Sequence, residues 1–395
     1  MNRDARLPIT AETWAMLERL VAFDTTSRES NLGLIEWVRD WLKGFGIGSR
    51  LTYDADRRKA NLFATIERGA RPGIVLSGHT DVVPVDGQPW DTDPFRATIR
   101  DDRIYARGAC DMKGFLAAAL AMTPRFLAAE LRAPVHFALS YDEELGCIGV
   151  RGLIEDLVRN GIRPAGCIVG EPTAMQPVIA NKGMRTFRCT VRGKEAHSAL
   201  APHGVNAIEY AARLVAYVRQ VADRMRATEP RDHGFEVPFT TLQTGLIRGG
   251  TAPNIVPREC EFHFEFRYLP GADPDAIERE IRAYAADVLE PEMKAVEPQA
   301  GFEFFTKAEI PGLDTAESDK VTALAQALSR NRAARKVAYA AEAGLFQQAG
   351  IPSIICGPGS IEQAHKPNEF VTLAELARCE AFLERLVGEL TAPQA

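Results

Sequence analysis

Five residues of the sequence are of the types that bind divalent metal ions, and most of them follow short apolar runs. They are His79, Asp111, Glu144, Glu171 and His365. Two imidazoles and three carboxylates suit a pair of divalent ions of intermediate softness, each with one nitrogen ligand and one carboxylate shared between them. Two such ions can hold both an attacking water and a substrate oxygen. Glu143 stands beside Glu144 and would be free to act as a general base.

The segment 74–83 carries the first of these residues. Its residues 74–76 are apolar and lie between two glycines, which predicts a short buried strand rather than a helix. His79 and Asp81 are two positions apart, so their side chains would point to the same side of an extended segment. The histidine could then bind a metal while the carboxylate holds its other ring nitrogen. For this stretch alone, a histidine with satisfied hydrogen bonds in a turn is the alternative.

The other acidic candidates also stand next to predicted secondary structure. Asp111 precedes a helical pattern over 115–131, where the positive end of the helix dipole would keep its carboxylate ionised. A structural helix cap is the alternative for Asp111. Glu143 and Glu144 directly follow the apolar run 135–140, and a pair of surface carboxylates would gain nothing from that position.

The composition restricts the class of protein. A chain of 395 residues exceeds what one hydrophobic core usually organises, which predicts two domains. The net charge of -6 and the lack of a long basic run argue against nucleic acid or an anionic membrane as a partner. No apolar run has the length of a signal peptide core or a membrane span, which predicts a cytoplasmic protein. Seven scattered cysteines are expected to be reduced.

The elements fall into two patterns along the chain. Up to about residue 182, apolar strands alternate with helices, which predicts an α/β domain with a mostly parallel sheet and one catalytic edge. A β-α-β-β-α-β order follows, which predicts an inserted α+β domain of the ferredoxin-like type. Its elements are expected at 184–192, 206–222, 240–247, 259–268, 275–288 and 302–305. We therefore expect residues 1–182 and 300–395 to form the catalytic domain and residues 183–299 to form the insertion.

The candidate residues lie in motifs that resemble those of the M20 family of metallo-aminoacylases and peptidases. The motifs are Ser-Gly-His-Thr-Asp-Val-Val-Pro at 77–84, Gly-Ala-Cys-Asp-Met-Lys-Gly at 108–114, Asp-Glu-Glu at 142–144, Gly-Glu-Pro-Thr at 170–173 and the late His365. Each is weak alone, but all five occur in the family's order, and the resemblance covers essentially the whole chain. It implies a zinc-peptidase-like catalytic domain with an inserted lid and dimerisation domain.

The resemblance also implies a role for each candidate. The ligand sets that it implies are His79 and Glu171 for one zinc ion, Glu144 and His365 for the other, and Asp111 as the bridge between the two ions. Each chain would hold two Zn²⁺ ions, with Co²⁺ as a possible substitute. Asp81 would orient His79, and Glu143 would be the general base. The peptide bond between Asp111 and Met112 is implied to be cis.

Three residues of the insertion also match the family's pattern. His197 resembles the lid histidine that stabilises the oxyanion, commonly across the interface of a homodimer. Asn254 and Arg267 match positions that hold the substrate's carboxylate or polar tail, and the fork of an arginine suits a carboxylate. A capping or surface role is the alternative for His197, and a solvated charge at a strand edge is the alternative for Arg267.

Four stretches resemble the acetylornithine deacetylases within this family. They lie at 181–185, 238–242, 342–347 and 357–365. This resemblance implies a small-molecule N-acyl amino acid substrate, N2-acetyl-L-ornithine, and a place in arginine biosynthesis. Glu342 or Glu362 would face the side-chain ammonium of this substrate, with Gly344 close by. The alternatives are a succinyl-diaminopimelate desuccinylase, a general aminoacylase or dipeptidase, a single-metal peptidase and a non-catalytic metal-binding relative.

Overall fold

The computed structural model describes residues 8–391, which divide into two compact units. The first comprises residues 8–180, 313–336 and 341–391, and the second comprises residues 181–312 and 337–340. The insertion therefore ends at Gly312, later in the chain than its predicted end at residue 299. The reason is that β14 (Gly301–Ile310) pairs along its length with β9 (Gly183–Arg192) of the second unit.

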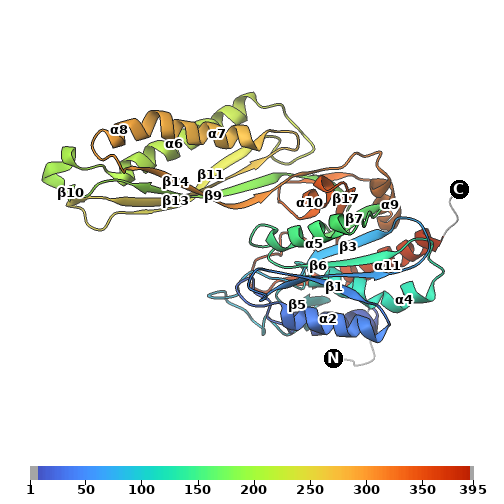
Figure 1. The fold of residues 1–395 in the computed structure, drawn as a ribbon. Helices are drawn as coiled ribbons and strands as arrows, with labels where there is room; N and C mark the ends of the chain where they lie inside the picture. Colours follow the sequence, from blue (N-terminus) through green and yellow to red (C-terminus); the bar gives the residue numbers. More distant parts are fainter. Residues whose placement is uncertain (1–7, 392–395) are drawn as a thin grey trace. The chain divides into compact units, whose positions relative to one another are not determined.

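A nine-stranded mixed sheet forms the centre of the first unit (Figure 1). Its four central strands are parallel and lie in the order β6 (Val135–Ser140), β3 (Ile74–His79), β7 (Gly166–Pro172) and β17 (Ser353–Gly357). Antiparallel pairing continues the sheet through β2 (Ala60–Ile66) to β1 (Ser49–Tyr53) on one side. On the other side follow β8 (Val178–Asn181), β15 (Leu313–Asp314) and β16 (Arg335–Val337). The predicted α/β class is thus confirmed, with a parallel centre and antiparallel flanks.

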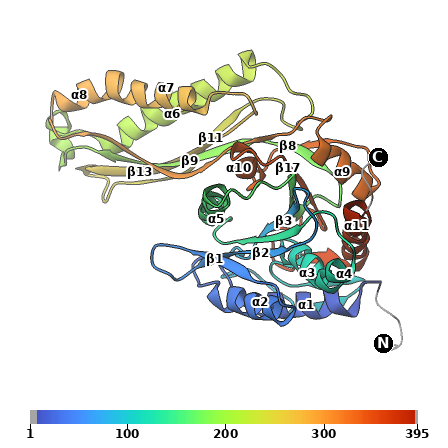
Figure 2. The same ribbon diagram turned by 45° about the vertical axis from the view of Figure 1, so that its right-hand side comes forward.

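Helices cover both faces of this sheet, as parallel strands that are buried throughout require. Figures 1 and 2 show α2 (Leu32–Gly44) and α5 (Ile148–Arg159) on opposite faces. Around α3 (Lys113–Ala121) pack α1 (Ala11–Val21) and α11 (Leu373–Thr391). The remaining helices are α4 (Thr123–Ala128), α9 (Lys320–Ser329) and α10 (Ala343–Gln348).

The helix after Asp111 is shorter than the pattern predicted. It ends as α3 (Lys113–Ala121), and α4 begins separately with Pro124 in its first turn, because a proline cannot donate the hydrogen bond that a continuous helix needs. The residues of α3 up to Leu120 are buried. Gly170 in β7 permits this close packing, since a Cβ atom there would lie 2.0 Å from the Phe115 ring. The start of α3, next to Asp111, is thereby held against the end of β7.

A small three-stranded sheet connects two distant parts of the first unit. The hairpin of β4 (Thr98–Arg100) and β5 (Arg103–Tyr105) pairs with β18 (Phe370–Thr372), which the sequence analysis did not predict. The segment that follows His365 therefore lies beside the segment that leads to Asp111.

The second unit is a four-stranded antiparallel sheet with helices along one face (Figure 1). The strand order is β11 (Thr241–Gly249), β13 (Glu259–Tyr268), β9 and β14, and the main helices are α6 (Ala207–Thr228) and α7 (Pro274–Tyr284), the latter continued by α8 (Glu290–Lys294). Every second residue of β13 is buried, because one face packs on the helices and the other does not. Two short strands, β10 (Ala196–His197) and β12 (Ile255–Val256), form a separate ribbon.

All seven cysteines are buried and unpaired, as the sequence analysis expected for reduced thiols. Burial raises the pKa of every one of these thiols. Within residues 8–391, none of the helices combines the length and the apolar character that a bilayer crossing needs.

Candidate metal centre

The predicted ligands lie around the carboxyl ends of the parallel strands. His79 is the last residue of β3, Glu171 lies at the end of β7 and Glu144 follows β6 in the chain. Asp111 precedes α3, and His365 lies in the loop after β17. Since the carboxyl ends of parallel strands meet at one edge of a sheet, chain segments far apart in sequence deliver their side chains to one place. The peptide bond between Asp111 and Met112 is cis, as the family resemblance implied.

The two carboxylate oxygens of Asp111 face different histidines. Oδ1 of Asp111 lies 3.0 Å from Nε2 of His79, and Oδ2 lies 3.3 Å from Nε2 of His365. Each histidine also faces a second carboxylate. Nε2 of His79 lies 3.7 Å from Oε1 of Glu171, and Nε2 of His365 lies 3.0 Å from Oε2 of Glu144. The arrangement is that of one carboxylate shared by two cation sites, each with one imidazole.

The donor atoms of this cluster fit metal ions. Oε1 of Glu171 is buried and has no hydrogen-bond partner within the described part of the chain, and a bare buried carboxylate oxygen calls for a cation or a proton. Ligand atoms of His79, Asp111 and Glu144 lie within 4.8 Å of one another, and so do those of His79, Glu143 and Glu171. Imidazole nitrogen and carboxylate oxygen are ligands that Zn²⁺ and Co²⁺ accept.

Burial and mutual charge shift the pKa values of the cluster. Burial alone would raise the pKa of Asp111, but hydrogen bonds with His365 and His79 hold it well below its usual range. Hydrogen bonds with Asp111 and Glu144 raise the pKa of His365 to about 10. Burial raises the pKa of Glu143 to about 8; the charges of Glu144 and Asp111 add to this shift, and that of His79 opposes it. Without cations the cluster therefore holds protons that metal ions would displace.

We expect the metal-free cluster to contribute less stability to the protein as the pH rises. The pKa of Glu143, about 8 in the folded chain, exceeds its ordinary value of 4.5, so the stabilisation by its proton is complete below pH 4.5 and is lost as the pH approaches 8. His365 acts in the same direction between 6.5 and 10. Burial lowers the pKa of Lys113 to about 7, which adds stability as the pH rises over the same range and opposes this loss. Calorimetry should therefore compare the chelated protein with chelated Glu143→Gln, whose Tm should fall less or rise more between pH 6 and 9.

The zinc-loaded protein serves as the control for this effect. Its Tm should not fall over the same range, because ions replace the protons and bind deprotonated ligands. In the chelated state, Glu143→Gln should reduce the slope. An equal change of Tm in the two chelated proteins over this range would contradict the expectation.

Asp81 contacts the site in another way than its spacing suggested. Nδ1 of His79 lies 2.9 Å from the backbone carbonyl oxygen of Asp81, whereas Oδ1 of Asp81 is 3.6 Å away. The carboxylate of Asp81 accepts hydrogen bonds from the backbone N–H groups of Glu143 and Glu144 and from the hydroxyl of Ser27. Asp81 thus orients the imidazole chiefly through its main chain, and its side chain fixes the turn that carries both glutamates.

A second contact fixes the same turn. Asp142, just before Glu143, forms an ion pair with Lys59, which also donates to the carbonyl oxygen of Ser27. The carboxylate of Glu143 accepts a hydrogen bond from the thiol of Cys147 at 3.3 Å. Lys59 was not among the predicted site residues, because it stands in a polar stretch with no motif around it.

Glu342 and Gly344 do not line an open site. Glu342 is fully buried, and its carboxylate accepts hydrogen bonds from Ser77 at 2.6 Å and Ser140 at 2.8 Å. Gly344 is buried inside α10. The prediction that Glu342 faces a substrate ammonium is therefore wrong, because its carboxylate instead ties α10 to β3 and β6. Glu362, the other candidate, is exposed and lies on the same loop as His365.

In the second unit, the structure brings His197 and Asn254 together. His197 is exposed, and its Nδ1 accepts a hydrogen bond from the backbone N–H of Ala199, which matches the capping alternative. The N–H of Ser198 donates to the carbonyl oxygen of Asn254 at 3.0 Å. Arg267 lies on β13, half-buried, with its Nε 3.3 Å from Oε1 of Glu265.

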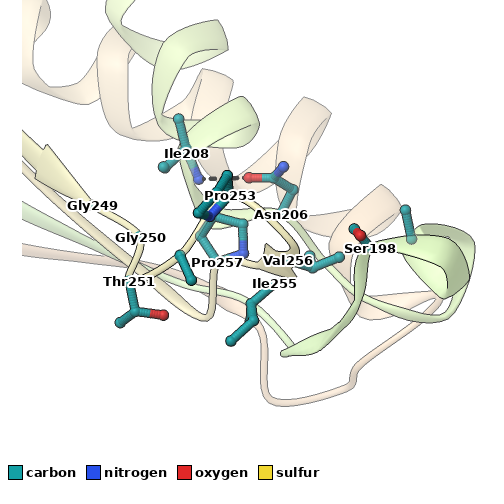
Figure 3. A pocket seen from close by; sticks show the side chains of 12 residues that line it. Ser198, Asn206, Ile208, Gly249, Gly250, Thr251, Pro253, Ile255, Val256 and Pro257 are labelled. Atoms are coloured by element: carbon teal, nitrogen blue, oxygen red, sulfur yellow. Dashed lines mark hydrogen bonds between the residues drawn. The ribbon is translucent and has the colours of Figure 1, made fainter.

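A cavity of about 550 Å³ lies beside the segments that carry His197 and Asn254 (Figure 3). Arg267 lies at the other end of β13, opposite Thr241 of β11. Ser198 and Thr251 are among its polar lining residues, and Ile208 and Ile255 are among its apolar ones. The side chain of Asn206 caps the N-terminus of α6 at this cavity by accepting a hydrogen bond from the N–H of Ile208 (Figure 3).

Comparisons with known proteins point to one family. The sequence pattern of peptidase family M20/M25/M40 matches residues 75–389. Acetylornithine deacetylase of Myxococcus xanthus is 37% identical over 381 residues, which are 95% of this chain and 96% of that protein. Acetylornithine deacetylase of Pasteurella multocida is 33% identical over 95% of this chain and 97% of that protein.

Solved structures share the fold. An M20 family metallo-carboxypeptidase from Sulfolobus solfataricus superimposes with a TM-score of 0.74 at 20% identity, over 97% of this chain and 99% of that chain. Human carnosine dipeptidase 1 has a TM-score of 0.71 at 16% identity, over 96% and 97%. With its family pattern, its near full-length relatives and this fold, the chain belongs to peptidase family M20/M25/M40.

Proposed function

We propose that the protein is a dinuclear zinc amidohydrolase that converts N2-acetyl-L-ornithine to ornithine and acetate. The observation that carries this proposal is the position of Asp111, whose two carboxylate oxygens face two different histidines. Relatives named acetylornithine deacetylase, 31–37% identical over most of both chains, support the choice of substrate and a place in arginine biosynthesis.

The ligand sets would be those expected from the sequence. His79 and Glu171 would hold one ion, Glu144 and His365 the other, and Asp111 both. Such ions, when bound, would polarise the amide carbonyl and lower the pKa of a water molecule. Co²⁺ would fit the same ligands.

Glu143 would act as the general base and then as the general acid. Its carboxylate would take a proton from the attacking water and return it to the leaving amine, so that ornithine departs as a neutral leaving group. The pKa of about 8 in the metal-free chain would fall once cations are near, because positive charge stabilises the carboxylate. Glu143 would then be ionised at neutral pH and ready to accept the proton.

We assign to the second unit the roles of lid and dimer contact. His197 would stabilise the oxyanion, which is the former carbonyl oxygen of the amide, and it would act across the interface of a homodimer. Asn254 and Arg267 would hold the carboxylate of the substrate. Arg267 suits this role because a guanidinium can donate two parallel hydrogen bonds to one carboxylate.

Turnover of three substrates tests the proposed reaction. On zinc-loaded enzyme, kcat/KM should be highest for N-acetylornithine, lower for N-acetylmethionine and lowest for succinyl-diaminopimelate. An equal or higher value for either competitor would overturn the ornithine assignment. Elemental analysis should find two zinc ions per chain, and one ion per chain would favour a single-metal peptidase.

Glu362 is the remaining candidate for recognition of the substrate's ammonium group. We expect Glu362→Gln to raise KM for N-acetylornithine about tenfold, because a charge-assisted contact is lost, and to leave KM for N-acetylmethionine unchanged. Glu36→Gln, which neutralises an exposed carboxylate on α2, is the matched control. A parallel rise of KM for both substrates would assign Glu362 no part in recognising the ammonium.

A further inference from the structure

We propose that Arg107, Glu369 and Gln88 form a clamp that positions two of the metal ligands, Asp111 and His365. The inference rests on the proposed dinuclear function and adds three positioning residues to it. Neither the family motifs nor the ligand geometry required these residues, and each of them acts on the main chain that carries a ligand.

Glu369 holds the backbone around the bridging ligand. Its Oε1 accepts hydrogen bonds from the N–H of Cys110 at 2.8 Å and from the N–H of Asp111 at 3.0 Å. Its Oε2 accepts a hydrogen bond from Nη1 of Arg107 at 2.7 Å. Both oxygens of this carboxylate are therefore engaged by donors, and the residue is 1% exposed.

Arg107 continues the clamp to the other ligand. Its Nη1 also lies 3.3 Å from the carbonyl oxygen of Lys366, and its Nη2 donates to Oε1 of Gln88 at 2.6 Å. Nε2 of Gln88 in turn donates to the carbonyl oxygen of His365 at 3.1 Å. One buried guanidinium thus connects the backbone of Asp111, through Glu369, with the loop of His365.

The backbone of the His365 loop has an uncommon conformation. The φ of 63° at His365 and the φ of 58° at Asn368 lie in the left-handed region, which residues other than glycine adopt less readily. Gln88 and Arg107 hold this loop through the carbonyl oxygens of His365 and Lys366, and β18 holds its C-terminal end by pairing with β5. The N–H of Ala106 also donates to the carbonyl oxygen of Glu369 at 3.2 Å.

The ion pair itself is buried on both sides, since the side chains of Arg107 and Glu369 are each 1% exposed. A buried ion pair contributes little net stability compared with apolar side chains, whereas the loss of one partner is costly. A pair that adds little to stability but spans two ligand segments is best explained by the geometry that it imposes on them.

The connections predict which ion each residue affects. Asp111 is shared by both ions, so loosening Glu369 should weaken both. Gln88 bonds directly to the His365 loop and reaches Asp111 only through Arg107 and Glu369, so its loss should weaken mainly the ion held by His365 and Glu144. This difference separates a positioning role from a general effect on folding, which would weaken both ions in either variant.

Glu369→Gln tests the predicted effect of Glu369 on both ions. The substitution keeps the shape but offers one acceptor and one donor, so in either orientation an amide N–H₂ faces a donor. We expect both dissociation constants for Co²⁺, measured by calorimetric titration of chelated protein, to rise by about 10–100-fold. The Co²⁺ absorption spectrum should change with them, since ligand positions alter it.

Gln88→Ala tests the predicted effect on the ion held by His365 and Glu144. Gln88 is only partly buried, so this variant should fold even if Glu369→Gln does not. It should weaken one ion about tenfold and leave the other within twofold. The binding step that disappears in His365→Ala identifies the affected ion. Unchanged affinity for both ions, or an equal loss of both, in Gln88→Ala would overturn the clamp.

Glu278→Gln is the matched control, since it neutralises a carboxylate paired with Arg185, a nearly buried arginine of the second unit. Its Co²⁺ affinities should equal those of the unsubstituted protein. If the unsubstituted protein binds two ions and Glu369→Gln binds both equally well, the clamp is wrong and the proposed function stands. If the unsubstituted protein binds fewer than two ions, the dinuclear proposal fails and the clamp fails with it.

Discussion

The Asp111→Ala variant is expected to bind neither ion tightly and to lose hydrolysis by roughly 10⁵-fold. Asp111 directs one carboxylate oxygen to His79 and the other to His365, so its removal takes one oxygen from each cation site. Metal ions contribute several kcal/mol each to stabilising the transition state, and a combined loss of about 7 kcal/mol corresponds to this factor. Metal content by elemental analysis and kcat/KM for N-acetylornithine measure the two effects.

Asp111→Asn separates charge from packing. The amide has nearly the shape of the carboxylate but no charge, so it should lose metal almost as completely as alanine does. Asp40→Ala removes an exposed carboxylate of α2 and should leave both measurements unchanged. If Asp111→Ala retained two ions per chain, the shared-ligand geometry would have no role in binding them.

Glu143→Ala is expected to lower kcat by about 10²–10⁴-fold while the variant retains two ions. A carboxylate oxygen of Glu143 lies within 4.8 Å of ligand atoms of His79 and Glu171, but Glu143 belongs to neither predicted ligand set. Its loss should therefore remove a proton acceptor rather than a metal site. Stopped assays for kcat, with metal analysis of the same samples, test this directly. KM should change far less than kcat.

The adjacent residue is the natural control for Glu143. Glu144→Ala removes the carboxylate that lies 3.0 Å from His365, and it should therefore lose one ion as well as activity. A Glu143→Ala variant with full activity would leave the proposed mechanism without its base. A Glu143→Ala variant that loses metal would make Glu143 a ligand instead.

Local sequence patterns were sufficient to locate the edge of the sheet at which the site lies. The apolar runs around residues 74–76, 135–140 and 167–169 are buried in β3, β6 and β7, because burial on both faces demands continuous apolar sequence. Polar residues that directly follow such runs must lie at the edge of the sheet where the strands end. The positions of His79 and Glu171 in the fold were therefore predictable, but the residues that they contact were not.

Partners between distant segments were not predictable in this way. The burial of Glu342 depends on hydroxyls of Ser77 and Ser140, which come from two different strands. The backbone carbonyl of Asp81 as the acceptor for His79 depends on a chain reversal that period-two alternation does not describe. Such contacts follow from packing of the whole unit and leave no periodic signal.

Arg107 and Glu369 illustrate the same point, since they are 262 positions apart in the chain. One signal was present but weak. A carboxylate directly before the apolar pair Phe370 and Val371 is unexpected in a buried strand, and it suggests a buried partner of opposite charge. The sequence gives no means of choosing that partner among 47 lysines and arginines.

Because all seven cysteines are buried and burial raises the pKa of each thiol, we expect the folded chain to react only slowly with thiol reagents, which attack the thiolate. Labelling must then wait for the chain to open. Cys189 and Cys260 belong to the second unit and the other five cysteines to the first. The number of labels per molecule, read by mass spectrometry over time, would therefore report which unit opens first, with no probe engineered into the protein.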